Sequence, residues 1–520
     1  MQGSILSSKK YCVLAVLGSV FAFTSLSLAQ DVSAFEKHVT VKKLANGLTV
    51  VICERPEAPV FSFFTHVDVG SAQEEVGQSG LAHMFEHMAF KGTDKIGTKN
   101  YPAEKLALEK VEKTYAAYNL ERRKRVGRDE AKLKTLDKAW QDAITEANKY
   151  VVVNEFGQIV ESNGGEGMNA TTDHDETVYM YSFPSNRVEL WAYLESERFL
   201  HPVLREFYKE RNVVMEERRM RTDSTPIGRL VEQFTSAAFV AHPYHRPVVG
   251  WMSDLQSFSA ADAGRFFDKY YVPSNITVTI VGDVKAAEVL PIIEKYFGRL
   301  PAKPRPEELS TVEPPQMAER RILLHDPSQP FFIEGYHRPD YRDKDDAVYD
   351  AIGDLMSNGR TSRLYRALVR DKKIAAQTAG FGNYPGQKYP NLFVFYAVPL
   401  PGHTNKEMED AIHVEIERIK KEDISADELK MLKTRAKAGL LRSLGENEGL
   451  AQALGATQAR YGDWRELFTQ VDRIDKLTAA DIRRVANKTF LPTNRTVGVI
   501  ETDRADSGAS AKSTASQGAE

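Results

Sequence analysis

The sequence predicts an α+β protein of two related halves, each a mostly antiparallel sheet covered by helices, with a cavity where the halves face each other. A chain of 520 residues is too long for one ordinary hydrophobic core. Two distant segments also match. The first is Ser259-Ala-Ala-Asp262 followed by Pro273-Ser-Asn-Ile-Thr-Val278, and the second is Thr478-Ala-Ala-Asp481 followed by Pro492-Thr-Asn-Arg-Thr-Val497. Both parts of the first segment match the second at the same offset of 219 residues.

Each copy of this repeat is typical of one helix followed by one strand. A Ser or Thr with an Asp three residues later predicts a capping box that opens a helix. The proline ends the helix, and the β-branched residues after it predict a strand. Near the start of the first half, Asn46-Gly47 predicts a hairpin turn. Sheets covered by helices are therefore expected in both halves.

The first half contains an insertion. Pro59-Val-Phe-Ser-Phe-Phe64 resembles Pro330-Phe-Phe-Ile333 at an offset of 271, which implies about 52 extra residues in the first half. The segment from about 101 to 155 is highly charged and has a helical period, which predicts a helical hairpin with a basic tip. Its two apolar stripes are Leu106, Val111, Tyr115 and Tyr118, and Leu133, Leu136, Trp140 and Ile144.

Changes in composition along the chain predict further domain boundaries. Lys9 and Lys10 precede an apolar run that ends in Ser27-Leu28-Ala29, which favours a cleaved secretory signal peptide over a membrane anchor. We therefore expect export, to a periplasm, and no stable membrane insertion after cleavage. The expected parts are a signal peptide (1–29), a metal-binding half (30–300), a Pro- and Glu-rich linker (301–316), a second half without metal (317–502) and a disordered tail (503–520).

The overall charge excludes one class of partner. With 42% hydrophobic and 27% charged residues, the chain is typical of soluble globular proteins. The net charge of −3 gives no support for nucleic-acid binding.

The motif His83-Met-Phe-Glu86-His87 indicates a metal site. Histidines four residues apart project from one face of a helix, and Glu86 lies beside them. Two neutral imidazoles can hold Zn²⁺, and an unligated carboxylate can take a proton from water. We expect Ser79 to cap the helix. The alternative is a surface helix that carries the same residues without a metal.

A catalytic zinc site normally has three protein ligands, so a third is needed. Glu210 and Glu217 are seven residues apart and share one helix face, where one carboxylate could bind the metal and the other could hold a ligand in place. The spacing does not choose between Glu216 and Glu217. A solvated acidic helix surface is the alternative.

The segment from Gly80 to Thr93 closely resembles the pitrilysin family of inverzincin metallopeptidases, which includes insulin-degrading enzyme and the mitochondrial processing peptidase. The length and the two halves are most similar to bacterial homologues of the processing peptidase. The resemblance implies that Glu217 is the third ligand of one zinc ion per chain, with Glu210 behind it. It also implies that Glu86 is the catalytic base.

The resemblance implies substrate contacts as well. Asn169, after the Gly-rich stretch Gly164-Gly-Glu-Gly167, is expected to border the substrate and to lead into an edge strand from about Glu176 to Phe183. The second half should supply an Arg and a Tyr seven residues apart. Arg370 fits, but Gln377 stands where the Tyr is expected.

The sequence therefore predicts a zinc-dependent endopeptidase that acts on peptides or small unfolded proteins. Gln377 favours an alternative, in which the chain is the metal-bearing subunit of a heterodimer and needs a partner for activity. A homodimer is also compatible with the sequence. A third possibility is a non-catalytic peptide-binding scaffold, against which the intact metal motif argues.

Overall fold

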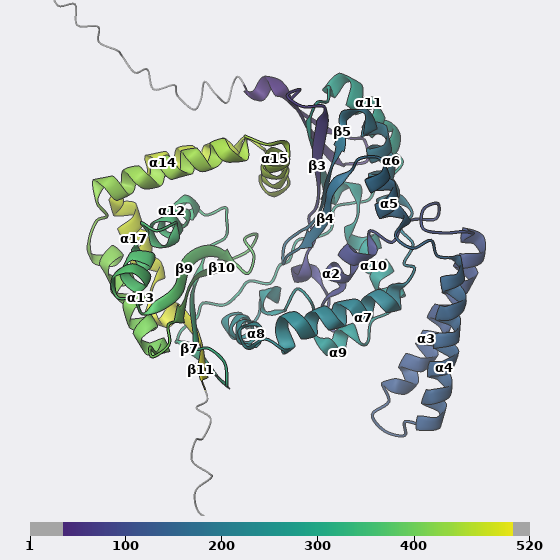
Figure 1. The fold of residues 1–520 in the computed structure, drawn as a ribbon, viewed down its shortest axis with the longest axis horizontal. Helices are drawn as coiled ribbons and strands as arrows, with labels where there is room; N and C mark the ends of the chain where they lie inside the picture. The colour runs from purple at the N-terminus through teal and green to yellow at the C-terminus, as the bar shows by residue number, and fades with distance from the viewer. Residues whose placement is uncertain (1–34, 503–520) are drawn as a thin grey trace, which may run out of the picture.

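The computed structural model describes residues 35–502, and it contains two sheets with helices around them (Figure 1). The predicted fold class is confirmed, because each half holds one mostly antiparallel sheet. The predicted signal peptide and C-terminal tail lie outside the described residues. Within residues 35–502, no helix combines the length and apolarity that crossing a membrane requires.

The first sheet has six strands in the order β1-β2-β6-β3-β5-β4. Its strands are β1 (Val39–Lys43), β2 (Thr49–Glu54), β3 (Val60–Val67), β4 (Glu166–Thr172), β5 (Thr177–Pro184) and β6 (Ile276–Gly282). Only the β2–β6 pair is parallel among these neighbours. The predicted turn at Asn46-Gly47 joins β1 to β2, and Gly47 has a φ of 97°, which glycine adopts without steric cost.

The second sheet repeats this pattern with five strands in the order β7-β11-β8-β10-β9. Its strands are β7 (Arg320–Asp326), β8 (Phe331–Arg338), β9 (Ala375–Tyr384), β10 (Asn391–Pro399) and β11 (Arg495–Thr502). Again one pair is parallel, β7 with β11. Thr49 lies opposite Thr277, and Arg320 lies opposite Thr496. These are equivalent positions at the two repeat offsets, so the halves share their strand register as well as their order.

Helices cover both sheets. The first half contains α2 (Leu81–Met88), α3 (Tyr101–Arg122), α4 (Glu130–Ala147), α5 (Glu155–Ser162), α6 (Val188–Leu200), α7 (Phe207–Arg218), α8 (Pro226–Ala238), α9 (Met252–Leu255), α10 (Ala260–Tyr270) and α11 (Ala286–Phe297). The second half contains α12 (Asp346–Ser357), α13 (Asn405–Lys421), α14 (Ala426–Ser443), α15 (Asn447–Tyr461), α16 (Glu466–Lys476) and α17 (Ala479–Thr489). Residues 301–318, between the halves, form no helix or strand.

Helices α3 and α4 form the predicted hairpin, which projects from the first half (Figure 1). Tyr115 and Trp140 are buried, and their rings pack 5.1 Å apart between the two helices of the hairpin. One residue of the predicted stripe was placed wrongly: the side chain of Leu106 is 69% exposed. The reason is geometric, since positions 106 and 111 are five residues apart and a helix face repeats every three or four.

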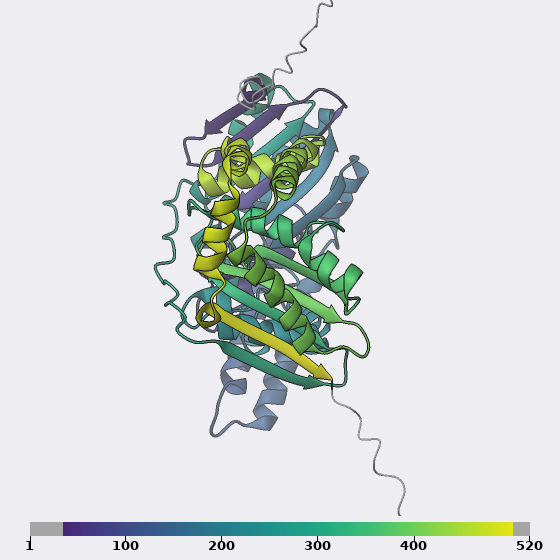
Figure 2. The same ribbon diagram turned by 90° about the vertical axis from the view of Figure 1, so that its left-hand side faces the viewer.

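The two halves exchange helices. Helix α8 of the first half packs on the second sheet, and α15 of the second half packs on the first sheet (Figures 1 and 2). Leu450 and Leu454 of α15 join Val51 and Phe64 in one apolar cluster. Leu230 and Phe234 of α8 join residues of β8 and β10 in another. Each sheet therefore has one face that only the other half covers, so separating the halves would expose apolar surface on both.

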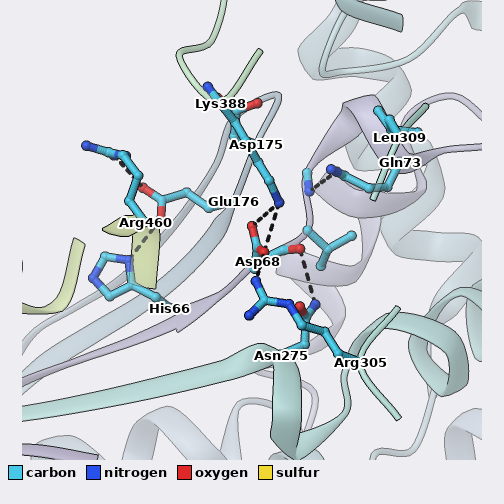
Figure 3. A network of polar contacts seen from close by, with 12 residues as sticks. His66, Asp68, Gln73, Asp175, Glu176, Asn275, Arg305, Leu309, Lys388 and Arg460 are labelled. Carbon is cyan, nitrogen blue, oxygen red and sulfur yellow. Dashed lines mark hydrogen bonds and ion pairs between the residues drawn. The ribbon is translucent and has the colours of Figure 1, made fainter. Parts of the chain in front are cut away.

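A polar network also joins the halves (Figure 3). Asp68, at the end of β3, accepts hydrogen bonds from Lys388 in the β9–β10 turn and from Arg305 in the segment between the halves. Asp175 accepts hydrogen bonds from the backbone N–H groups of Gln387 and Lys388 at 2.7 and 3.0 Å. The β4–β5 turn of the first half is thus bound to the β9–β10 turn of the second.

The exchanged helix α15 yields a stability prediction. Leu454 is fully buried, so Leu454→Ala should lower the free energy of unfolding by about 2–5 kcal/mol. Leu441 on α14 is 69% exposed, so Leu441→Ala should change it by no more than about 0.5 kcal/mol. Thermal unfolding followed by circular dichroism compares the two variants. Equal midpoints would contradict the contribution of α15 to the first sheet.

Candidate metal centre

Helix α2 presents the histidines of the motif from a short, deeply packed segment. Leu81, Met84, Phe85 and Met88 are buried, so one side of the helix is held against the core of the first half. His83 and His87 lie one turn apart on another side, with ring centroids 4.8 Å apart. Packing of the apolar side therefore determines where both imidazoles point.

The N-terminus of α2 is capped by a side chain from an earlier part of the chain. The expected cap, Ser79, instead donates a hydrogen bond to Asp254 at 2.6 Å, so that prediction was wrong. The N-cap residue is Gly80, which has a φ of 95° and no side chain to offer. The buried carboxylate of Glu74 takes over this role, because it accepts hydrogen bonds from the N–H groups of Gly80 and Ala82 at 2.9 and 2.8 Å.

Helix α7 supplies a third possible ligand. Glu217 Oε2 lies 3.5 Å from His83 Nε2 and 3.5 Å from His87 Nε2. The three side chains offer ligand atoms that all lie within 4.8 Å of one another, and within residues 35–502 no other group of His, Cys, Asp or Glu does this. Glu216, which the spacing allowed, points away, is 59% exposed and pairs with Arg219.

The donor set fits a zinc ion. Two imidazole nitrogens and one carboxylate oxygen are ligands that Zn²⁺ takes in catalytic sites, with a fourth position left open. Burial lowers the pKa of His83 to about 4, so this imidazole is neutral and can ligate near pH 7. Burial also lowers the pKa of His87, but its hydrogen bonds to Glu210 and Glu217 outweigh this and raise the pKa to about 9. The same two carboxylates would stabilise a bound dication.

Glu210 fixes one of these histidines from behind. Glu210 Oε1 lies 3.0 Å from His87 Nδ1, on the side of the ring opposite the other ligands. Its second oxygen pairs with Lys91 Nζ at 2.6 Å. Burial alone would raise the pKa of Glu210, but the hydrogen bonds from His87 and Lys91 lower it to about 2, so the group is ionised. An ionised partner at Nδ1 leaves Nε2 of His87 free to face a metal.

Glu86 lies beside the three donors without being one of them. Burial raises its pKa above the ordinary value, and a hydrogen bond with the side chain of Thr172 on β4 counteracts part of this effect. A pocket of about 500 Å³ opens next to it, which we call the metal pocket. The metal pocket is lined by Glu86, His87, Phe90, Lys91, residues 151–154, Asn169, Ala170, Glu206, Lys209 and Glu210.

The chain is similar to known peptidases along most of its length. Residues 49–119 and 143–250 match the model described as insulinase (peptidase family M16), and residues 257–436 match the model described as the peptidase M16 inactive domain. A zinc protease of Helicobacter pylori, PqqE, is 30% identical across 94% of this chain and 98% of its own. The chain belongs to the M16 peptidase family. The resemblance to pitrilysin-type peptidases is thereby confirmed.

Further relatives show how widely the M16 fold is shared. A probable mitochondrial-processing peptidase subunit beta of Schizosaccharomyces pombe is 24% identical across 86% of this chain and 87% of its own. The crystal structure of a protease from Helicobacter pylori superposes with a TM-score of 0.74 at 28% identity, covering 89% of this chain and 99% of that one. The periplasmic protease PqqL from Escherichia coli has a TM-score of 0.67 at 17% identity, with 90% and 48% covered.

Three buried arginines hold this M16 site together, and none of them was predicted from the sequence. Arg211 donates to the backbone carbonyl of Phe258, and Arg218 donates to that of Gly250. Arg205, which pairs with Glu104, donates to the carbonyls of Lys91, Thr93 and Ile96 in the loop after α2. The only sequence signal was the doublet Glu-Arg repeated after seven residues, at Glu210-Arg211 and Glu217-Arg218.

The substrate-side predictions have mixed outcomes. Asn169 lies on β4 and lines the metal pocket. The edge strand is β4 itself, so the expected edge at 176–183 was wrong: that segment is β5, which is paired on both sides. Sequence alone could not order the two strands, because both are β-rich and consecutive.

Arg370 and Gln377 do not line the metal pocket. Arg370 is exposed and pairs with its neighbour Asp371. Gln377 lies on β9 and donates a hydrogen bond from Nε2 to Tyr396 Oη at 2.8 Å. A tyrosine hydroxyl is therefore present next to position 377, although it comes from the adjacent strand β10.

Removing the charge behind His87 should weaken metal binding. Glu210→Gln is expected to lower zinc affinity about 10–100-fold, because the anion that orients the ligand is lost. Glu216→Gln on the same helix changes an exposed residue and should leave the affinity unchanged. Competition titration with a chromophoric chelator measures both. Equal affinities in the two variants would contradict this role of Glu210.

Proposed function

We propose that this M16 chain is a zinc-dependent endopeptidase that hydrolyses peptides or small unfolded proteins in the periplasm. The observation that carries the proposal is the convergence of His83, His87 and Glu217 beside an unligated carboxylate, Glu86, at the wall of a pocket. The zinc protease relatives support the metal and the reaction. The expected signal peptide and the periplasmic location named for the PqqL structure support the compartment.

His83, His87 and Glu217 would hold one zinc ion per chain, which when bound polarises a peptide carbonyl and makes water more acidic. Glu86 takes a proton from the attacking water at its carboxylate, while the water oxygen bonds to the carbonyl carbon. Glu86 then donates that proton to the amine nitrogen as the carbon–nitrogen bond breaks. The raised pKa of Glu86 suits both steps, because a carboxyl group whose pKa lies closer to neutral pH accepts a proton and gives it up again more readily.

The edge strand β4 is placed to bind an extended substrate. One side of β4 pairs with β5, and the other side has no strand partner in the sheet. A peptide can add to such an edge through backbone hydrogen bonds, which bind any sequence. Because Asn169 and Ala170 of β4 line the metal pocket, a peptide on this edge would lie beside Glu86.

A second candidate function is that of the metal-bearing subunit of a heterodimeric peptidase. Gln377 motivates it, because the family resemblance leads one to expect a tyrosine there. The relative named as a subunit beta supports it. A non-catalytic peptide-binding scaffold is the third candidate. The intact metal motif and the matching Glu217 argue against it.

Glu86→Gln should abolish hydrolysis and keep zinc, because the amide that replaces the carboxylate cannot accept the proton and Glu86 is not one of the three donors. We expect loss of at least about 10²-fold in kcat, the contribution of a general base. Casein cleavage and metal analysis of the same preparation measure the two effects. An active variant would refute the role of Glu86, and a parent protein without stoichiometric zinc would favour the scaffold.

Activity of the isolated chain separates the first two functions. Purified protein should cleave denatured casein alone, and a chelator should stop the cleavage. Mass-spectrometric mapping of the products with and without chelator records both the activity and the cleavage sites. If the parent chain alone shows negligible turnover and Gln377→Tyr raises it at least about tenfold, the result would instead support the heterodimer, in which a partner supplies the missing group.

A further inference from the structure

A second pocket lies at the base of the helical hairpin, and we call it the hairpin pocket. Its volume is about 440 Å³, which is within the range of about 300–1,000 Å³ typical of ligand sites. Its apolar walls come from Leu108, Val111, Ile144, Val203, Leu204 and Phe207. These residues belong to α3, α4, the segment before α7 and the start of α7, so the pocket exists only because the hairpin is there.

The chemistry of the walls selects an apolar ligand. Glu112, at the pocket wall, has both oxygens bound: Tyr208 Oη donates at 2.7 Å and the Ala261 N–H donates at 3.2 Å. Among the described residues that line the pocket, none has a buried side-chain N or O atom without a hydrogen-bond partner. The buried part of the pocket therefore offers no unsatisfied polar group to a ligand, so an apolar group can enter it without leaving a polar atom unpaired.

The hairpin pocket adjoins the metal pocket along two shared segments. The chain at 147–148 lines the hairpin pocket, and its continuation at 151–154 lines the metal pocket. On the facing side, Glu206 and Lys209 line both pockets. The two pockets therefore lie next to each other at the first turn of α7, with Glu206 and Lys209 in the wall of both.

The walls of the hairpin pocket are closely packed. Tyr208, on the first turn of α7, packs against Tyr115 and Trp140 of the hairpin at ring distances of 4.4 and 5.1 Å. Arg211 lies over Tyr208 and donates to Tyr115 Oη at 2.7 Å. Glu206 forms salt bridges with Lys91 on one side and Lys209 on the other. A pocket with walls this well held is preformed, which lowers the entropic cost of binding.

We propose that the hairpin pocket is a substrate subsite that takes a large aliphatic or aromatic side chain of the peptide bound at the metal pocket. This assignment deepens the proposed function and rests on it for the identity of the ligand. The substrate chain leaves the metal pocket past Glu206 and Lys209 and places an apolar residue among Leu108, Ile144 and Phe207. The hairpin thereby adds affinity for unfolded segments, since such residues are buried in folded proteins.

The kinetic test compares two leucines of α3. Leu108→Asp places a charge inside the pocket, whereas Leu106→Asp places it on an exposed side of the same helix outside the pocket. With β-casein as substrate, Leu108→Asp should raise KM about tenfold and change kcat less than about twofold, and Leu106→Asp should change neither. With a fluorogenic peptide trimmed to the residues next to a mapped casein cleavage site, both variants should match the parent.

A second variant, Ala261→Phe, tests the same pocket in case Leu108→Asp fails to fold. Ala261 is exposed and lines the pocket mouth, so a phenyl group there fills the pocket without removing a core side chain. It should raise KM for β-casein as Leu108→Asp does. Wild-type KM for casein in both variants, or equal slowing of casein and the trimmed peptide, would overturn the assignment.

A binding measurement keeps this proposal separate from the peptidase proposal. In a Glu86→Gln background, a casein peptide with a leucine or phenylalanine at the distal position should change the fluorescence of Trp140, which packs on Tyr208. The change should disappear with Leu108→Asp or when that residue of the peptide is replaced by glutamine. Binding without any hydrolysis by the parent protein would refute the peptidase and retain the subsite. Glu86-dependent hydrolysis with no effect of Leu108→Asp would do the reverse.

Discussion

Helix α7 must hold two carboxylates against the histidines of α2, and the architecture of the first half meets that requirement. Glu210 and Glu217 face the histidines, while the residues after them, Arg211 and Arg218, are buried and bound to backbone carbonyls on the other side. Each arginine donates from Nη1 of its buried guanidinium to one of these carbonyls, so it acts as a position-specific anchor for the helix. Geometry at the metal donors thus depends on contacts remote from them.

The duplicated fold was put to different uses in its two halves. At the repeat offset, Leu429 and Ala436 on α14 stand where Glu210 and Glu217 stand on α7, so the second half lacks the acidic face. Its contribution is structural, because α15 covers the face of the first sheet that no helix of the first half covers. The turns at Asp175 and Lys388 bind the halves to each other at the end of the edge strand β4. The second half therefore supports the strand on which we expect substrate to lie.

Local patterns predicted the elements better than their ends and neighbours. The repeat at 259–278 and 478–497, the Asn46-Gly47 turn and the hairpin are set by interactions between residues close in sequence. The predicted cap of α2 was wrong because the buried carboxylate of Glu74 accepts hydrogen bonds from the N–H groups at the helix start, a role that was expected of Ser79. The edge strand was wrong because pairing partners, rather than β-propensity, decide which strand is outermost.

The sequence by itself determined the chemical identity of the site and the duplicated architecture, because helical spacing puts His83 next to His87 and Glu210 on the face of Glu217. It also indicated the family through the motif. Only the tertiary structure decided that α7 lies against α2 with Glu217, and not Glu216, facing the histidines. It alone placed Tyr396 beside Gln377 and opened a pocket beneath the hairpin. Those features depend on packing between segments remote in the chain, which no local pattern encodes.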